Sequence, residues 1–176
     1  MQQVLYTTRW NRLTRRPTMD HAWVSPQEAP ALYARDAGID VVDAERRDEN
    51  GTPRPVWVIG ASPVGFRVQL FTPGGAVARL VDWMRRDGRL WRDSSTEYLY
   101  PDDDTAYRMS DATTIIETIT RPDGTATLVH TDGSRRTEVT EFTDVATDGN
   151  WVDVPEFGDW GPLVNATLGA RPGPPA

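Results

Sequence analysis

Asp-Gly dipeptides between short threonine-rich segments constrain the fold of this chain more than any other feature of its sequence. They occur at Pro122-Asp123-Gly124, Asp132-Gly133 and Asp148-Gly149. Asp and Gly both tolerate positive φ, so an Asp-Gly dipeptide between β-prone segments is a strong signal for a hairpin turn. Threonine is typical of strands that have one solvated face. We therefore predict strands at residues 89–92, 96–100, 106–109, 113–120, 125–131 and 136–143.

Two short helices are predicted before this region. The first begins at Ser25-Pro26-Gln27-Glu28, where a serine cap, a proline in the first turn and a glutamate form a capping box, and Gly38 ends it. The second is expected within residues 77–88, where apolar side chains follow the i, i+3, i+4, i+7 spacing of one helical face. These side chains are Val77, Leu80, Val81 and Met84, with Gly88 as the stop.

Residues 56–59 are wholly apolar and residues 66–70 alternate apolar with polar side chains, so both are predicted strands. Together these segments predict an α+β fold: an antiparallel β-meander with two short helices packed on one face or at one end. The chain has 176 residues, a length typical of one domain. We expect residues 1–168 to form a single globular domain and the Pro/Gly-rich residues 169–176 to be a disordered tail.

Composition narrows the classes of function. The chain has no cysteine, which excludes disulfides and cysteine nucleophiles and is consistent with the expected cytoplasmic location. No apolar run approaches the roughly 18 residues of a membrane-spanning helix. Residues 1–92 hold 14 Arg and 10 acids, whereas residues 93–176 hold 5 Arg and 16 acids. An acidic half of this kind repels phosphate backbones, so we expect no nucleic-acid partner. From the absence of a long apolar run we expect no membrane partner either.

The common catalytic arrangements are missing from the sequence. The two histidines, His21 and His130, are far apart and neither has a companion at ligand spacing. Residues 60–65 resemble a nucleophile elbow around Ser62 but have one residue too many before the second glycine, so a hairpin turn is the better interpretation. Gly74-Gly75 lacks the lysine and further glycines of a phosphate loop and is interpreted as a helix entry. We therefore expect no enzymatic activity, no cofactor and no metal.

Two charged segments remain as candidate binding sites, one for a cation and one for a nucleic acid. The run Asp102-Asp103-Asp104 offers three carboxylates that suit a hard cation, but it has neither the spacing nor the turn glycine of a calcium loop, which favours a solvated loop tip. Residues 9–16 interleave arginines with Trp10, as nucleic-acid readers do. The acidic second half argues against that interpretation and favours an arm or first strand packed near acidic surface.

Residues 144–163 are the most unusual part of the sequence. They combine two tryptophans and a phenylalanine with five acidic residues and two prolines. Proline and glycine at this density exclude a helix or a central strand. Two compatible interpretations remain: the aromatic side chains close one end of the core, or they anchor an acidic surface that binds a protein partner.

The segment Trp-Val-Asp-Val-Pro-Glu-Phe-Gly-Asp-Trp at residues 151–160, in a small acidic protein without cysteine, resembles immunity proteins of actinobacterial polymorphic toxin systems. Within these it is most similar to the immunity factors of the tuberculosis necrotizing toxin, an NAD-hydrolysing toxin. The resemblance implies a non-enzymatic cytoplasmic inhibitor that binds the cognate toxin domain and occludes its NAD site.

A dinucleotide site attracts phosphates. Acidic side chains that imitate phosphate charge, and aromatic side chains that imitate a stacked base, could therefore compete with the dinucleotide for this site. The partner-binding hypothesis assigns charged contacts to Asp153, Glu156 and Asp159 and the role of anchors to Trp151 and Trp160. Secondary candidates for partner contact are Arg9, Arg12, Asp102, Asp103 and Asp104.

Two rival functions remain open. The first is a small-ligand-binding or enzymatic β-fold whose sheet curves around an aromatic pocket. That pocket would be lined by Trp57, Phe66, Trp91, Tyr98 and Tyr100. The second is an acidic secretion chaperone or adaptor that shields a basic client.

Overall fold

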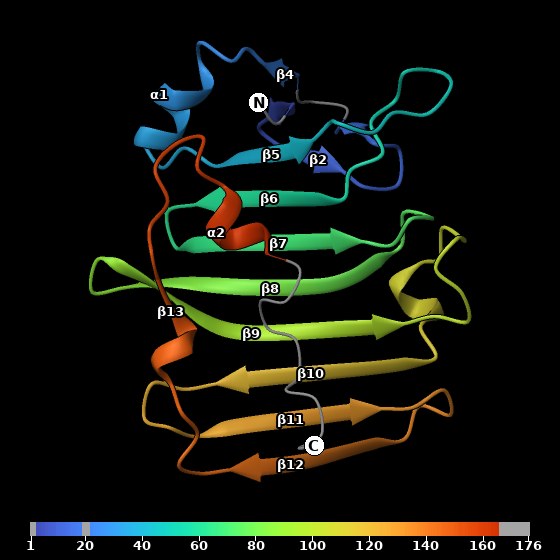
Figure 1. Ribbon diagram of the computed structural model, residues 1–176, viewed down its shortest axis with the longest axis vertical. Helices are drawn as coiled ribbons and strands as arrows, with labels where there is room; N and C mark the ends of the chain where they lie inside the picture. Colours follow the sequence, from blue (N-terminus) through green and yellow to red (C-terminus); the bar gives the residue numbers. More distant parts are fainter. Residues whose placement is uncertain (1–2, 19–21, 166–176) are drawn as a thin grey trace.

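A single antiparallel sheet dominates the computed structural model, which describes residues 3–18 and 22–165 (Figure 1). Eleven strands of this described part belong to the sheet, in the order β12-β11-β10-β9-β8-β7-β6-β5-β1-β4, with β13 paired to β9. From β5 to β12 every strand pairs with the next one along the chain. The predicted meander is confirmed, and the protein is β-rich with two short α-helices in these residues, so the α+β label overstates the helical part.

The strands of the main sheet are β1 Val4–Thr7, β4 Trp23–Val24, β5 Ile39–Asp43, β6 Trp57–Ser62, β7 Gly65–Phe71, β8 Val77–Arg86, β9 Arg89–Leu99, β10 Thr114–Thr120, β11 Ala126–Thr131, β12 Thr137–Phe142 and β13 Trp151–Asp153. A separate hairpin pairs β2 Trp10–Asn11 with β3 Arg16–Pro17. The helices are α1 Ala29–Ala34 and α2 Gly161–Val164, and two 3₁₀ turns are η1 Met109–Asp111 and η2 Asp148–Asn150. The predicted tail at residues 169–176 lies outside the described residues.

The first predicted helix is present and the second is not. At α1 the predicted capping box forms one turn ahead of the helix: Ser25 Oγ donates to Glu28 Oε2 at 2.8 Å, and the Glu28 amide donates to Ser25 Oγ at 3.2 Å. Residues 77–86, predicted as a helix, are instead strand β8. The Asp87-Gly88 pair, with φ of +49° and +77°, is the turn of the β8–β9 hairpin rather than a helix stop.

Several strand boundaries also differ from the prediction. Residues 89–92 and 96–100 belong to one strand, β9, which continues past an irregularity in its pairing with β8 between Asp82 and Trp83. Residues 106–109, predicted as a strand, comprise the irregular loop that leads into η1 and the first residue of η1. The Asp148-Gly149 pair lies in η2 and turns the chain toward β13, so it does not form a hairpin.

The core lies between one face of the sheet and a covering layer of α1 and the C-terminal segment (Figure 1). We call residues 144–165 the strap, because they leave β12 and run across this face past β9 to α2 near β7. Trp83, Leu90 and Leu163 are at most 1% exposed in this core. On the opposite face Trp10 packs on Val42 and Val58 in a smaller cluster.

Candidate functional site

The aromatic side chains of the strap close the core. Trp160 is 2% exposed and belongs to the main core cluster. Phe157 stacks on Tyr6 with ring centroids 5.3 Å apart. Because so deeply buried a side chain has no surface for a partner, the structure removes Trp160 from the predicted binding set. Trp151 is half-buried, with its ring 5.0 Å from that of Trp91.

The carboxylates of the strap face solvent, as the partner-binding hypothesis requires. Glu156 and Asp159 are exposed. Asp153 pairs with Arg89 across the β9–β13 ladder at 3.0 Å, and its side chain remains 89% exposed. Since the ion pair is solvated on the Asp153 side, it holds the carboxylate weakly and leaves it available to a competing cation.

These carboxylates belong to a longer acidic run that begins on the edge strand of the sheet. Residues 137–165 contain seven acidic residues and no Arg, Lys or His. All seven are exposed: Glu138, Glu141, Asp144, Asp148, Asp153, Glu156 and Asp159. We call residues 137–165 the acidic run; it comprises β12 and the strap.

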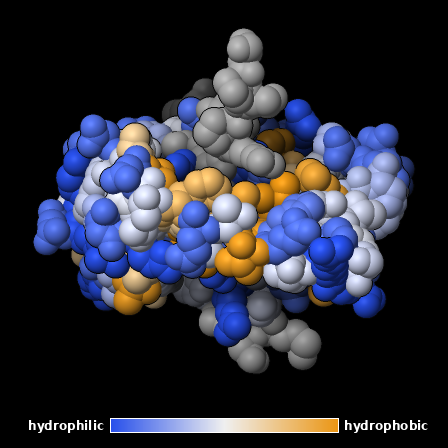
Figure 2. All heavy atoms as spheres, turned by 90° about the horizontal axis from the view of Figure 1, so that it is seen from below, coloured by the Kyte–Doolittle hydropathy of each residue, from blue (hydrophilic) through white to orange (hydrophobic). Residues whose placement is uncertain are grey.

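Strand β12 is one of the two edge strands of the sheet in the part of the chain that the structure describes, the other being β4. All six of its residues are exposed, including Val139 at 60% and Phe142 at 45%. Viewed toward this edge, hydrophobic atoms gather near the centre of the molecule between hydrophilic flanks (Figure 2). An exposed edge offers unpaired backbone N–H and C=O groups as well as side chains.

The Asp102-Asp103-Asp104 tip is an internally bonded loop. The Asp102 carboxylate accepts hydrogen bonds from the Tyr107 hydroxyl at 2.8 Å and from the amides of Asp104 and Thr105. These bonds, that from Tyr107 foremost, lower the pKa of Asp102. No group of three or more His, Asp or Glu suited to a metal ion occurs within residues 3–18 and 22–165.

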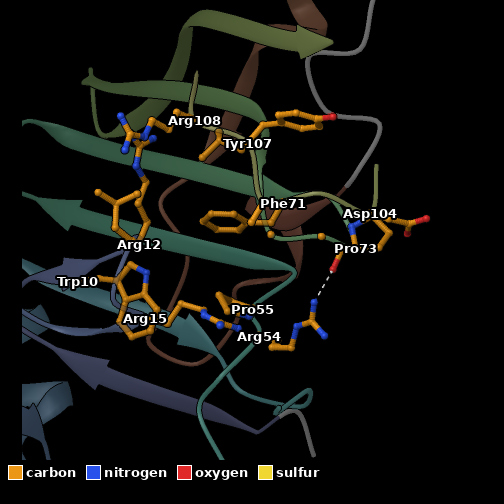
Figure 3. A pocket seen from close by; sticks show the side chains of 15 residues that line it. Trp10, Arg12, Arg15, Arg54, Pro55, Phe71, Pro73, Asp104, Tyr107 and Arg108 are labelled. Carbon is orange, nitrogen blue, oxygen red and sulfur yellow. Dashed lines mark hydrogen bonds between the residues drawn. The ribbon is translucent and has the colours of Figure 1, made fainter. Parts of the chain in front are cut away.

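The structure brings Arg12 and Asp104 together in one pocket, whereas the exposed Arg9 does not line it. Three further arginines that were not predicted as site residues share the pocket: Arg15, Arg54 and Arg108 (Figure 3). Arg15 lies in the arginine-rich run noted in the sequence, but nothing in the sequence connects Arg54 or Arg108 with it.

The aromatic pocket of the rival hypothesis does not form as predicted. Trp57, Phe66 and Trp91 are at most 4% exposed and lie within the packed interior. Tyr98 and Tyr100 border a hollow of about 380 Å³ that the other three do not line. Three of the five predicted lining residues, Trp57, Phe66 and Trp91, are therefore core residues.

The remaining candidate motifs have structural roles. Residues 60–65 form the predicted hairpin, with Ser62 paired to Gly65. Gly74-Gly75 lies in the turn between β7 and β8, so its interpretation as a helix entry is wrong. His130 lies on β11 opposite Glu138 of β12, and His21 lies outside the described residues.

No protein-family model matches the sequence. Comparison with the curated proteins gives no match either. Comparison with the solved structures likewise gives none. Within the described residues no helix has the length and apolar character needed to cross a membrane.

Proposed function

We propose that this protein is a non-enzymatic cytoplasmic immunity protein that binds a cognate NAD-hydrolysing toxin domain and occludes its NAD site. The observation that carries the proposal is the acidic run, which consists of an edge strand and the strap and holds seven exposed carboxylates but no Arg, Lys or His. The resemblance of residues 151–160 to immunity proteins supplies the class of partner.

The open edge and its charge favour a basic partner over a second copy of this chain. An added strand can satisfy the unpaired backbone groups of β12. Glu138 and Glu141 on this strand are exposed, and two copies paired here would bring four carboxylates together. Like charges across an interface are unfavourable, whereas a basic segment is attracted.

The strap carboxylates would then compete with the phosphates of NAD for the phosphate-binding surface of the toxin domain. A dinucleotide site concentrates positive potential at its mouth. Asp153, Glu156 and Asp159 project from one continuous segment on the same chain as the edge strand. Trp151 is the remaining aromatic candidate for contact, since Trp160 is a core residue.

The test uses the toxin domain encoded beside this gene and two readouts. Binding is measured by calorimetry at low and high salt, and cellular NAD is measured with toxin alone and with both proteins. We expect Asp153→Arg/Glu156→Arg/Asp159→Arg to raise Kd about tenfold or more and to abolish NAD protection. Glu49→Arg, an exposed acid outside the acidic run, is the matched control and should leave both unchanged.

The outcomes separate the proposal from its rivals. Unchanged affinity in the triple variant would remove the strap from the interface, and Glu138→Arg/Glu141→Arg then tests β12 by itself. Tight, salt-sensitive binding without NAD protection would favour the acidic chaperone or adaptor. If the folded protein does not bind the toxin domain, or if the toxin domain expressed alone does not deplete NAD, the proposed function is overturned.

A further inference from the structure

The pocket that contains Arg12 lies where four separate segments meet at one end of the sheet. These are the β2–β3 hairpin, the loop before β6, the β7–β8 turn and the loop between β9 and β10. Its volume of about 430 Å³ lies in the range of small-molecule sites.

The pocket is basic although the protein is acidic overall. Four arginines and one carboxylate, Asp104, line it, in a chain with a formal net charge of −7. Figure 3 shows Arg12 and Arg108 gathered at one side, Arg15 and Arg54 at another, and Phe71 between them. Four like charges around one cavity repel one another unless an anion lies among them.

The pocket arginines are poorly neutralised by the protein itself. Arg15 lies 3.6 Å from Asp48, and Arg54 donates to the carbonyl oxygen of Pro73 at 3.3 Å. The guanidinium groups of Arg12 and Arg108 form no ion pair within residues 3–18 and 22–165. Two guanidinium groups on one side of the cavity therefore have donors to spare for an anion, and guanidinium matches the paired oxygens of a phosphate.

Aromatic side chains line the same cavity. Phe71 and Trp10 contribute apolar surface, and the Trp10 indole N–H has no acceptor in the described part of the chain. The Tyr107 ring stacks on Tyr100 at 5.3 Å with an interplanar angle of 5°, and its hydroxyl is held by Asp102. Fixed aromatic rings beside arginines are a surface on which a planar ring can stack.

The walls are held in place without a ligand. The Gly74 amide donates to the carbonyl oxygen of Asp103 at 2.7 Å, which ties the β7–β8 turn to the loop that carries Tyr107 and Arg108. The Trp10 amide donates to the Asp40 carboxylate at 2.6 Å, which ties the β2–β3 hairpin to β5. A preformed site loses less entropy on binding than one that must be ordered by its ligand.

We propose that this pocket binds a small phosphate monoester that carries a planar ring, the phosphate held by Arg12 and Arg108 and the ring placed against Phe71. The inference does not depend on the proposed function, since the pocket lies outside the acidic run. Arg15 and Arg54 contribute long-range attraction from the other side of the cavity.

The test is calorimetric titration of the full chain with AMP, UMP and 4-nitrophenyl phosphate, a purine, a pyrimidine and a simple ring. We expect at least one to bind, with Kd raised about tenfold or more by Arg12→Gln/Arg108→Gln. Arg46→Gln, on an exposed loop outside the pocket, should bind as the parent does. Far-ultraviolet circular dichroism establishes that each variant is folded.

Each other outcome overturns a stated part of the proposal. If none of the three monoesters binds at millimolar concentration, the site does not take this class. If adenosine binds as tightly as AMP, the phosphate is not recognised. If inorganic phosphate binds as tightly as the monoesters, the ring is not recognised. Binding that Arg12→Gln/Arg108→Gln leaves unchanged would place the ligand elsewhere.

Discussion

The Tyr33 hydroxyl donates a 2.6 Å hydrogen bond to the carbonyl oxygen of Pro155, joining α1 to the strap across 122 positions of sequence. The Tyr33 ring also meets Trp160 edge-on, with centroids 5.5 Å apart, and lies 5.7 Å from Phe157. The strap is therefore part of the core and is fixed at its centre, while its carboxylates face solvent. The proposed binding would therefore not require the strap to become ordered first.

Removal of this hydrogen bond should weaken the fold measurably. Tyr33→Phe keeps the ring and deletes the hydroxyl, so the Pro155 carbonyl loses its partner. We expect the free energy of unfolding to fall by about 1 kcal/mol, from urea titration. Tyr107→Phe is the matched control, because the Tyr107 hydroxyl bonds an exposed carboxylate and its loss should have a smaller effect. If Tyr33→Phe lowers the free energy of unfolding no more than Tyr107→Phe does, the hydrogen bond from Tyr33 to Pro155 is not formed in solution.

Helix α2 should contribute to stability through one side chain. Leu163 is 1% exposed in the main core, and Leu163→Ala is expected to lower the free energy of unfolding by about 2–5 kcal/mol through lost burial and a residual cavity. Val64→Ala, at a side chain that is 66% exposed, should change it by less than about 0.5 kcal/mol. If both variants unfold at the same urea concentration, the end of the strap does not pack on the sheet.

Strand β8 shows why part of the fold could be predicted from sequence and part could not. Val81 and Trp83 face the core, whereas Leu80 and Met84, which flank them along the strand, lie on the other face of the sheet. Because both faces carry apolar side chains, the strand lacks simple alternation and its apolar positions coincide with helical spacing. The Asp87-Gly88 turn was the available signal for a hairpin, and it has the same chemistry as the confirmed turn at Asp123-Gly124.

The two candidate sites, the strap and the arginine-lined pocket, differ in how far they could be predicted from the sequence. The acidic strap is contiguous, so its composition identifies it directly. The pocket is assembled from four loops and turns, and only Arg12 and Asp104 of its lining were selected from local patterns. Which loops meet depends on strand order and register, and no local pattern encodes the approach of Arg54 and Arg108 to the same cavity.

The contact of Gly74 with the β9–β10 loop gives a prediction about the pocket wall. A Cβ at Gly74 would lie 2.3 Å from backbone atoms of Asp104, so Gly74→Ala must push the turn and the loop apart. We expect a loss of about 1–3 kcal/mol in the free energy of unfolding and faster amide hydrogen exchange at residues 102–105. A Cβ at Gly149 meets no atom within 4 Å, so Gly149→Ala should change neither the free energy of unfolding nor the amide exchange at residues 102–105. Unchanged exchange in Gly74→Ala would show that the contact is absent.

Alkaline pH should destabilise the protein through its tyrosines. Burial raises the pKa of Tyr100 to about 12, and the Tyr98 phenol adds to the shift; an unfolded tyrosine titrates near pH 10. The folded state therefore binds more protons than the unfolded state between these values, so stability is full below about pH 10 and falls as pH rises toward 12.

Tyr100→Phe removes this titration but also the hydrogen bond that the Tyr100 hydroxyl donates to the carbonyl oxygen of Val77. The variant should therefore be less stable than the parent at pH 8 and should lose less stability between pH 10 and about 12, a range set by the raised pKa of Tyr100. Urea unfolding at a series of pH values measures both effects. Tyrosinate absorbance of the folded parent should show a phenol that ionises well above pH 10. Parallel stability curves for parent and variant would contradict the prediction, since the pH dependence would then come from other groups.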